Sequence, residues 1–489
     1  MSVKKIRNRL AIKQYSEIRG GLEPLEPRRM MSASFPTVTQ TAITGGTELA
    51  VSVSGGEQIT LSQTGSGVNV TQAATITYLP GDLNQDGGVN FGDLILGVQN
   101  FGTVGFAGLV SIVQEFGQTD PQTPAASNLY SGTFVEIAVA CVSGDNTVTL
   151  DSTVVDAAVL QGGSGNDTLV AGAGTTTLYS GTGQDLLEAG TGIDTLVALD
   201  ANPDTLQGGS GMDSFWATST DQITNVSAAE TALQAVHLVT AVPALASPTI
   251  GVSGAVYTSF ASDPLFASTG PGVLDIKQGQ EGDCWYLASL AAFAQTDPNQ
   301  IRQDIVQLND GTFLVRFFNI NTPVYEHVDA TLPTSNGGLV FAKLGQGNSL
   351  WVPLMEKAFA AFRFSADSYS NLSGGWMNEA YNDLGITNTD SFAWSSPTAM
   401  LQQIQTELNS GQAVTAGILT VPNGVPLIGN HSYTVVAVTT DTNGNLVGLE
   451  VRNPWGVVGI SGYAGNNGYE TITAAQAFAA IAGTTAGVV

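Results

Sequence analysis

Positive charge is the scarcest feature of this 489-residue chain. It has 15 Lys and Arg against 41 Asp and Glu, for a formal net charge of −26. Residues 31–276 contain no Lys or Arg at all, although they hold 22 Asp and Glu. Such a stretch cannot neutralise phosphates, so nucleic acid is excluded as its partner. Its uncompensated carboxylates instead predict that the chain binds cations.

Cysteine and long apolar runs are also scarce. Cys141 and Cys284 are the only cysteines, which excludes a disulfide framework, and no zinc-type spacing occurs. No apolar run reaches the roughly 18 residues of a membrane span, so we expect no transmembrane segment. The basic segment 1–33 lacks the apolar core of a secretory signal. Its stretch LEPLEPRRMMSA at 22–33 resembles an LEPR-type export motif of bacterial surface proteins, and this predicts an extracellular or cell-surface protein.

Composition changes along the chain, and these changes predict a multidomain α+β protein. Alternating Thr, Val, Ser and Ile with Gly breaks indicate strands, a pattern that is interrupted by a segment with helical periodicity and then resumes. Basic residues return at Lys277, and five of the six tryptophans follow it. The predicted divisions are a basic export segment (1–33), a β-rich leader (34–80), a polar loop with two helical stretches (81–117), β strands with repeats (118–225), a linker (226–268) and a separate domain (269–489).

The segment DLNQDGGVNFGD at 82–93 has the spacing of a calcium loop. Asp82, Asn84 and Asp86 occupy loop positions 1, 3 and 5, and Asp93 occupies position 12. Gly87 supplies the sharp turn between them. The segment resembles a dockerin-type loop, which would imply a cohesin-type partner. Its second half has no acidic loop, and this absence argues against cohesin docking.

A nine-residue repeat begins with GGSGNDTLV at 162–170 and resembles the RTX calcium-binding repeat. Its aspartate position falls at Asp167, Thr176, Asp185, Asp194, Asp204 and Asp213, each followed two residues later by an apolar side chain. In such a parallel β-roll each repeat makes half a turn, so alternate repeats stack on one side. One side then presents Asp167, Asp185 and Asp204, and the other presents Asp194 and Asp213. We expect these carboxylates to bind Ca²⁺.

Cys284 stands in QGQEGDCWYLASL at 278–290, where helical apolar spacing begins. Asp283 occupies the predicted N-cap position. A helix N-terminus lowers the pKa of a thiol and stabilises the thiolate, which is the environment of a nucleophile. A buried core cysteine is the alternative interpretation, and it fits a position inside a helix better than one in the first turn.

A cysteine nucleophile needs a base, and the chain offers His237, His327 and His431. His431 begins a strand pattern that a DTNGN turn joins to a second strand ending near Asn453. The hairpin should bring His431 close to Asn453, whose amide can orient the imidazole.

Residues 278–489 resemble the calpain family of papain-like cysteine proteases. The resemblance rests on the Cys284 segment, on LWVPLMEKAFAAF at 350–362, and on NHSYTVVAV and VRNPWG around His431 and Asn453. It implies a two-lobed core after the β-roll, with Cys284 as nucleophile, His431 as base and Asn453 as orienting residue. It also implies that Gln278 donates to the oxyanion and that a protein or peptide is the substrate. An inactive surface-attachment protein and another Cys–His acyl-transfer enzyme stay open as alternatives.

Overall fold

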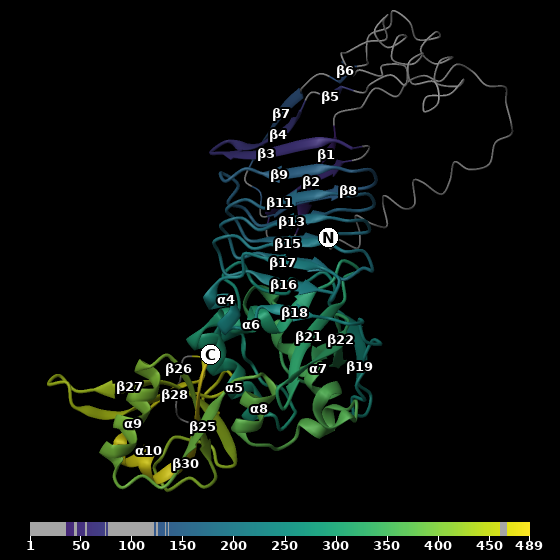
Figure 1. Ribbon diagram of the computed structural model, residues 1–489. Coiled ribbons are helices and arrows are strands. Elements are labelled where there is room, and N and C mark those ends of the chain that lie inside the picture. Colours follow the sequence, from purple (N-terminus) through teal and green to yellow (C-terminus); the bar gives the residue numbers. More distant parts are fainter. Residues whose placement is uncertain are drawn as a thin grey trace, which may run out of the picture. The chain divides into compact units, whose positions relative to one another are not determined.

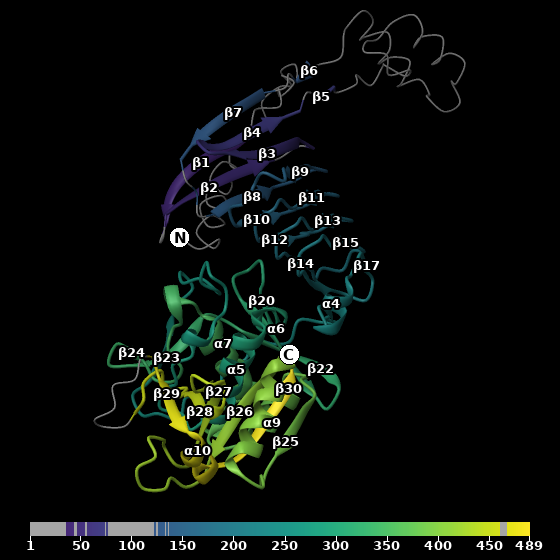
Figure 2. The same ribbon diagram turned by 90° about the vertical axis from the view of Figure 1, so that its left-hand side faces the viewer.

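The structure is a computed structural model (Figures 1 and 2). It describes residues 36–43, 46–53, 56–73, 75–76, 122–123, 126–132, 134, 136–459 and 467–489. The described residues divide after Ser227 into two compact units. The predicted export segment 1–33 and the predicted calcium ligands Asp82, Asn84, Asp86 and Asp93 lie outside the described residues.

The first unit is a solenoid whose parallel strands alternate between two sheets, as the nine-residue repeat predicted. Figure 1 shows β9, β11, β13, β15 and β17 stacked in order. One sheet has the order β1 (Thr37–Ile43), β2 (Gly46–Val53), β8 (Glu136–Cys141), β10 (Ala158–Gln161), β12 (Thr176–Tyr179), β14 (Thr195–Ala198) and β16 (Ser214–Ala217). The other has the order β17 (Gln222–Thr224), β15 (Thr205–Gln207), β13 (Leu186–Glu188), β11 (Thr168–Val170), β9 (Thr147–Leu150), β3 (Gln58–Thr64), β4 (Gly67–Gln72) and β7 (Ala126–Ser131).

The apolar side chain of each repeat stacks on the equivalent side chain two repeats away. Leu169 pairs with Leu187, and Leu187 with Leu206, while the opposite sheet aligns Leu178, Leu196 and Phe215. All six are fully buried. The half-turn geometry of a β-roll is therefore confirmed, and burial of these side chains is the main source of its stability.

Two short strands mark where the solenoid chain is interrupted. β5 (Thr75–Ile76) pairs antiparallel with β6 (Gln122–Thr123), with Ile76 opposite Gln122. The chain therefore leaves and returns at neighbouring positions. This is the topology of an insertion between strands that belong to one solenoid.

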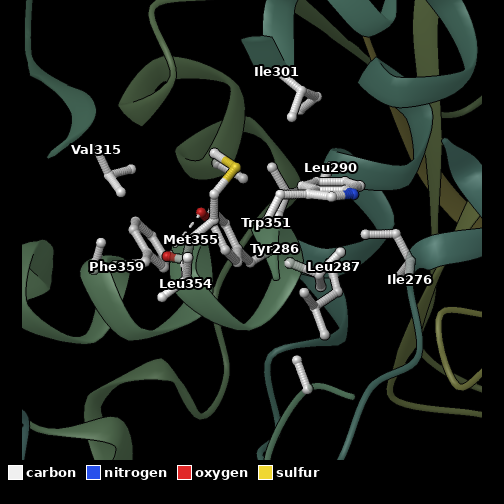
Figure 3. Packing of buried hydrophobic residues seen from close by; sticks show 14 of the residues in the cluster. Ile276, Tyr286, Leu287, Leu290, Ile301, Val315, Trp351, Leu354, Met355 and Phe359 are labelled. Atoms are coloured by element: carbon white, nitrogen blue, oxygen red, sulfur yellow. Dashed lines mark hydrogen bonds between the residues drawn. The ribbon is translucent and has the colours of Figure 1, made fainter. Parts of the chain in front are cut away.

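The second unit has two lobes, each with its own apolar core. The first lobe is mainly helical, and Figure 3 shows Tyr286, Leu290, Met355 and Phe359 packed at its centre. Its elements are α4 (Ala228–Ala232), β18 (Val236–Leu238), β19 (Val256–Ser259), η1 (Val273–Asp275), α5 (Cys284–Thr296), α6 (Pro298–Asp304), β20 (Ile305–Gln307), β21 (Phe313–Asn319), β22 (Thr322–Val328), β23 (Thr331–Ser335), β24 (Gly338–Leu339), η2 (Gln346–Asn348), α7 (Trp351–Phe362), η3 (Arg363–Ser365), η4 (Tyr369–Leu372) and α8 (Met377–Asp383).

The second lobe is built on a six-stranded antiparallel sheet with the order β25-β30-β26-β27-β28-β29. Its elements are β25 (Asn388–Ser391), α9 (Pro397–Asn409), β26 (Gln412–Ile418), β27 (His431–Thr440), β28 (Leu446–Arg452), β29 (Tyr469–Thr473), α10 (Ala474–Ala480) and β30 (Ile481–Val488). The DTNGN turn closes the β27–β28 hairpin, because Asp441 accepts hydrogen bonds from the backbone N–H groups of Asn443 and Asn445.

Helix α5 is apolar on every side, which allows it to be buried between its own lobe and the second lobe. Its residues from Trp285 to Ala294 are all buried, as expected of a helix that lies inside a protein. It also packs against the second lobe, where the Thr434 hydroxyl of β27 donates to the Ala288 carbonyl at 2.8 Å. The first residue of α5 is therefore held at the boundary between the lobes.

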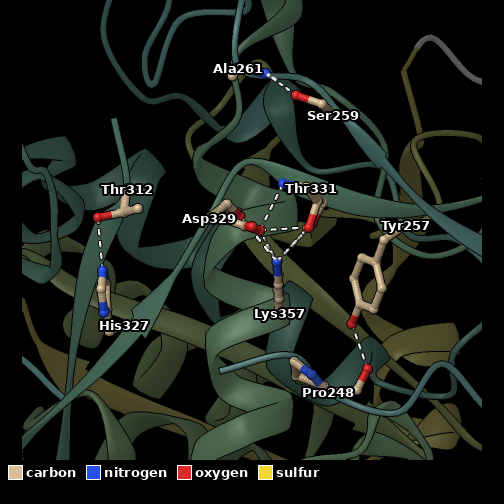
Figure 4. Close-up of polar contacts among 9 residues, drawn as sticks. All are labelled: Pro248, Tyr257, Ser259, Ala261, Thr312, His327, Asp329, Thr331 and Lys357. Atoms are coloured by element: carbon tan, nitrogen blue, oxygen red, sulfur yellow. Dashed lines mark hydrogen bonds and ion pairs between the residues drawn. The ribbon is translucent and has the colours of Figure 1, made fainter. Parts of the chain in front are cut away.

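Helix α7 is anchored by buried polar contacts. Lys357 is almost fully buried and pairs with Asp329 at 2.7 Å, while its Nζ also donates to the Thr331 carbonyl (Figure 4). Trp351 donates its indole N–H to Asp275 at 2.7 Å. A buried Lys357 ammonium that lost these acceptors would strongly destabilise the fold. Trp351 and Lys357 of the 350–362 segment therefore have structural roles.

Candidate active site and candidate calcium sites

Cys284 is the first residue of α5, and its side chain is half-buried. Burial raises the pKa of its thiol, and the charge of Asp283 acts in the same direction, while contacts with Ser432 oppose them. This direction is opposite to the lowered thiol pKa expected from the helix terminus. Desolvation at the lobe boundary is the largest contribution to the raised pKa.

Asp283 occupies the N-cap position, as predicted, but its side chain makes no capping hydrogen bond. Its fully buried carboxyl group instead interacts with the buried carboxyl group of Glu356, which accepts the Ala342 N–H at 2.9 Å. Burial raises the pKa of both groups, and the charge of Asp283 raises the pKa of Glu356 further, whereas the interaction with Glu356 lowers the pKa of Asp283. The proton of the pair is therefore held by Glu356. This reduces the negative charge beside the Cys284 thiol.

His431 and Asn453 lie together, as the hairpin predicted. His431 Nε2 is 2.8 Å from Asn453 Oδ1. That oxygen also accepts the Trp455 N–H at 2.9 Å, and Asn453 Nδ2 donates to the Val458 carbonyl at 3.2 Å. These two contacts fix the orientation of the amide, so His431 Nε2 must carry the proton. His431 Nδ1 is then the basic nitrogen of the neutral imidazole.

The environment of His431 is apolar as well as ordered. The Trp455 ring lies 4.8 Å from the imidazole, centroid to centroid, and the Tyr433 ring lies 5.2 Å away. Burial lowers the pKa of His431, and the hydrogen bond to Asn453 opposes this effect. The neutral imidazole is therefore the resting form, and it can accept a proton.

The predicted site residues come together from both lobes. Cys284 contacts Ser432, the residue after His431. The Gln278 backbone N–H donates to the Pro454 carbonyl at 2.8 Å, next to Asn453. The Gln278 side-chain Nε2 donates to the Glu281 carbonyl at 2.6 Å, and this contact fixes one of its two N–H groups.

The other two histidines are held in structural contacts. His327 Nδ1 lies 2.9 Å from the Pro243 carbonyl. Its Nε2 lies 2.8 Å from the Thr312 hydroxyl, as Figure 4 shows. His237 is fully buried, and burial lowers its pKa well below the ordinary value. His431 is therefore the histidine available to Cys284.

The repeat aspartates form two buried columns, one on each side of the solenoid. Column 1 is Asp167, Asp185 and Asp204, and column 2 is Asp194 and Asp213. Within a column, each carboxylate accepts the backbone N–H of the equivalent residue two repeats earlier. These contacts are Asp167 N–H to Asp185 Oδ1 (2.6 Å), Asp185 N–H to Asp204 Oδ1 (2.8 Å), Thr176 N–H to Asp194 Oδ1 (2.8 Å) and Asp194 N–H to Asp213 Oδ1 (3.0 Å).

These carboxylates fit a hard cation. Burial raises the pKa of Asp185 and Asp194 to about 7 and that of Asp204 to about 6, so leaving the charges uncompensated is costly. In the part of the chain that the structure describes, no three His, Cys, Asp or Glu side chains cluster as a metal site. A bound ion would therefore combine these carboxylates with backbone carbonyl oxygens, which Ca²⁺ readily accepts.

Two family models match parts of this chain. Residues 256–471 match the family model of the calpain family cysteine proteases, and residues 161–196 match that of the RTX calcium-binding nonapeptide repeat. Residues 256–471 are a calpain-family cysteine protease domain. RTX repeats bind calcium and are typical of secreted bacterial proteins. Among the helices that the structure describes, none has the length and apolar character needed to cross a membrane.

Curated calpains are similar to this domain but are much longer proteins. The rat calpain-1 catalytic subunit is 32% identical over 243 residues, which is 46% of this chain and 33% of the calpain. The human calpain-2 catalytic subunit is 31% identical over 239 residues, which is 45% of this chain and 33% of the calpain. The chain thus spans about a third of the length of these relatives.

The calpain-like domain also contains an arginine that the sequence analysis did not identify. The almost buried Arg363 donates to two carbonyls of segment 371–374 and pairs with Glu379 at 2.9 Å. Its guanidinium lies 4.4 Å from the ring of Trp285, the residue after the nucleophile. The Gly374 N–H donates to the Gly282 carbonyl at 2.9 Å. A basic residue directly after an apolar helix, in a chain with few basic residues, was the available signal.

The RTX columns extend further than the repeat pattern indicated. Asn146 precedes column 1 and donates to Asp167, whereas Asp221 follows it and accepts the Asp204 N–H at 2.9 Å. Asn146 stands 21 residues before Asp167, which breaks the nine-residue spacing. Asp221 stands eight residues after Asp213, so a one-residue deletion concealed it.

Proposed function

We propose that this chain is an exported, calcium-binding cysteine endopeptidase that uses a Cys284–His431–Asn453 triad. The observation that carries the proposal is the fixed tautomer of His431. The amide of Asn453 holds the proton on Nε2, which leaves Nδ1 as a base beside the lobe boundary where Cys284 lies. The calpain-family domain and the RTX repeats support the peptidase chemistry and the calcium binding.

In the proposed acylation step, His431 Nδ1 removes the proton from Cys284 Sγ as the sulfur attacks the carbonyl carbon of the substrate peptide. The carbonyl π electrons move to oxygen, which becomes an oxyanion. When this intermediate collapses, the C–N bond breaks and His431 returns the proton to the leaving amine. The product is a thioester on Cys284.

The oxyanion needs donors that are already in position. The Cys284 backbone N–H is one proposed donor. The second is the free N–H of the Gln278 side chain, whose other N–H is engaged by the Glu281 carbonyl. The backbone contact between Gln278 and Pro454 ties this donor to the Asn453 segment.

Deacylation reverses the proton transfers. His431 Nδ1 removes a proton from water as the water oxygen attacks the thioester carbonyl. The C–S bond then breaks, the acid is released, and the imidazolium returns its proton to Cys284 Sγ. Asn453 keeps the imidazole in one orientation throughout, because its oxygen accepts a hydrogen bond from the Nε2–H group in each protonation state.

Casein hydrolysis tests the proposed function. We expect cleavage by the full chain in calcium, and no cleavage by Cys284→Ala. Cys141→Ala is the matched control, because Cys141 is a buried strand residue of the solenoid, and this variant should retain activity. Equal hydrolysis by wild type and Cys284→Ala would reject the triad. Incorporation of an amine into casein without cleavage would instead identify an acyl-transfer enzyme.

The export motif and the dockerin-like loop complete the proposal. We expect the LEPLEPRRMMSA segment to direct export, and the loop at 82–93 to bind one calcium ion with a local effect. Fractionation of cells that express the chain with and without residues 1–33 tests the first expectation. Retention of both forms inside the cell would contradict it.

A further inference from the structure

The two sides of the RTX solenoid differ in how they satisfy their carboxylates. In column 2, each aspartate uses its second oxygen to close its own loop. The Gly190 N–H donates to Asp194 Oδ2 at 2.8 Å, and the Gly209 N–H donates to Asp213 Oδ2 at 2.8 Å. Together with the contacts to Oδ1, these bonds give both oxygens of each column 2 carboxylate a backbone donor.

Column 1 lacks this second set of contacts. Asp167, Asp185 and Asp204 are at most 3% exposed, yet the Oδ2 atom of each is buried without a hydrogen-bond partner among the described residues. A buried carboxylate oxygen without a partner is costly, so three in succession require an explanation. Ser180 interacts with the Asp204 side chain, but it does not satisfy Oδ2.

Backbone conformation differs between the columns at the positions that carry glycine. A glycine stands four residues before the aspartate at Gly163 and Gly181 in column 1 and at Gly190 and Gly209 in column 2, whereas Asp200 stands at this position before Asp204. In column 1 these glycines have φ of +90° and +99°, in the left-handed region, whereas the column 2 glycines have no positive φ. The loops before Asp167 and Asp185 therefore place their N–H groups differently and leave the carboxylate oxygen open. The Oδ2 atom of Asp204 is open as well, in a loop that has no glycine at this position.

Both ends of column 1 are closed. Asn146 carries a neutral amide, whose oxygen accepts the backbone N–H groups of Gly56 and Glu57. Asp221 accepts the Asp204 N–H on one oxygen and the Thr218 N–H on the other, at 2.6 Å. The open carboxylates are therefore confined to three consecutive positions.

From these contacts we infer that the solenoid binds its calcium ions on one side only, at the open oxygens of Asp167, Asp185 and Asp204. A hard cation is the partner that suits a row of buried, unpaired carboxylate oxygens. The column 2 aspartates instead serve as structural acceptors that close the loops in the presence or absence of calcium. The inference rests on calcium binding by the RTX repeats and assigns it to particular residues.

Two isosteric substitutions at equivalent positions test the inference in the full chain. Asp185→Asn changes column 1, and Asp194→Asn changes column 2. Bound calcium is counted after gel filtration at saturating calcium, and the melting temperature is measured in calcium and in chelator. Any ion in the loop at 82–93 is common to all forms, so differences from wild type report the solenoid.

We expect Asp185→Asn to lose at least one bound ion and most of the calcium-induced rise in melting temperature, without loss of stability in chelator. Asp194→Asn should keep the wild-type ion count but melt lower in both conditions, because its amide group would face the Gly190 N–H. If Asp185→Asn does not fold, Asp204→Asn replaces it, and we expect the same loss of bound calcium and of the calcium-induced rise in melting temperature. Equal ion loss in both columns, or loss only from Asp194→Asn, would overturn the inference.

Discussion

At the scale of single residues, the chemistry of the site depends on which nitrogen of His431 is protonated. Asn453 Oδ1 accepts from both Trp455 and His431, so removing the amide releases the imidazole orientation without removing the base. We expect His431→Ala to lower kcat by at least about 100-fold, the usual range for a general base. Asn453→Ala should lower it less. Initial rates of peptide hydrolysis measure both effects. An equal loss of kcat in both variants would contradict the orienting role of Asn453.

The protonation of Cys284 is a second test at this scale. Burial raises the pKa of the Cys284 thiol and lowers the pKa of His431, so thiol and imidazole should both be neutral in chelator near pH 7. A raised thiol pKa means less thiolate at any given pH. Iodoacetamide labelling of Cys284 should therefore rise only above the ordinary thiol range of about 8.5. Labelling well below pH 8 in chelator would show a preformed thiolate, and the buried Cys141 serves as the unreactive control.

At the scale of elements, Arg363 connects helix α7 to the segment before α8 and to the ring of Trp285. We expect it to be a positioning residue that keeps the loop beside the nucleophile in place. Arg363→Lys keeps the charge but loses the planar fork that reaches two carbonyls and a ring at once. It should raise KM for a peptide substrate more than it lowers kcat.

Glu379→Gln is the matched control for Arg363. Glu379 is 42% exposed, and an exposed ion pair contributes only about 1 kcal/mol or less. This variant should keep both constants near wild type. If Glu379→Gln shifted KM as strongly as Arg363→Lys, the ion pair and not the carbonyl contacts would position the loop.

Sequence patterns predicted the features that depend on a regular spacing or on neighbouring segments of the chain. The nine-residue spacing predicted both solenoid sheets, because each apolar residue faces the interior once per half-turn. The hairpin pattern placed His431 beside Asn453, because a short turn leaves little choice of pairing. The Asp283 side chain was predicted less well, because its interaction with Glu356 joins residues 73 positions apart. The left-handed φ of Gly163 could not be predicted from the sequence. Gly190 also stands four residues before a repeat aspartate, but it has no positive φ.

At the scale of the whole molecule, pH should act on the buried carboxylates of both columns, and calcium on those of column 1. In chelator, burial holds the pKa of Asp185 and Asp194 near 7 and that of Asp204 near 6, above the ordinary value of about 4. A carboxyl group with a raised pKa in the folded state stabilises that state at low pH and loses this effect as pH rises.

The melting temperature of the solenoid transition in chelator should therefore fall between pH 5 and pH 8. The net charge of −26 acts in the same direction, because self-repulsion also grows as carboxyl groups ionise. In calcium the fall should be smaller or reversed, since ions bind the ionised form. Scanning calorimetry at several pH values measures this. A melting temperature that rises with pH in chelator would contradict the prediction.

The pairing of β5 with β6 also bears on how such a protein can change over evolutionary time. Ile76 and Gln122 are paired on neighbouring strands, and 45 residues separate them in the sequence. A segment joined in this way can be gained, lost or exchanged without altering the strand register on either side. Its ancestry can therefore differ from that of the solenoid that carries it.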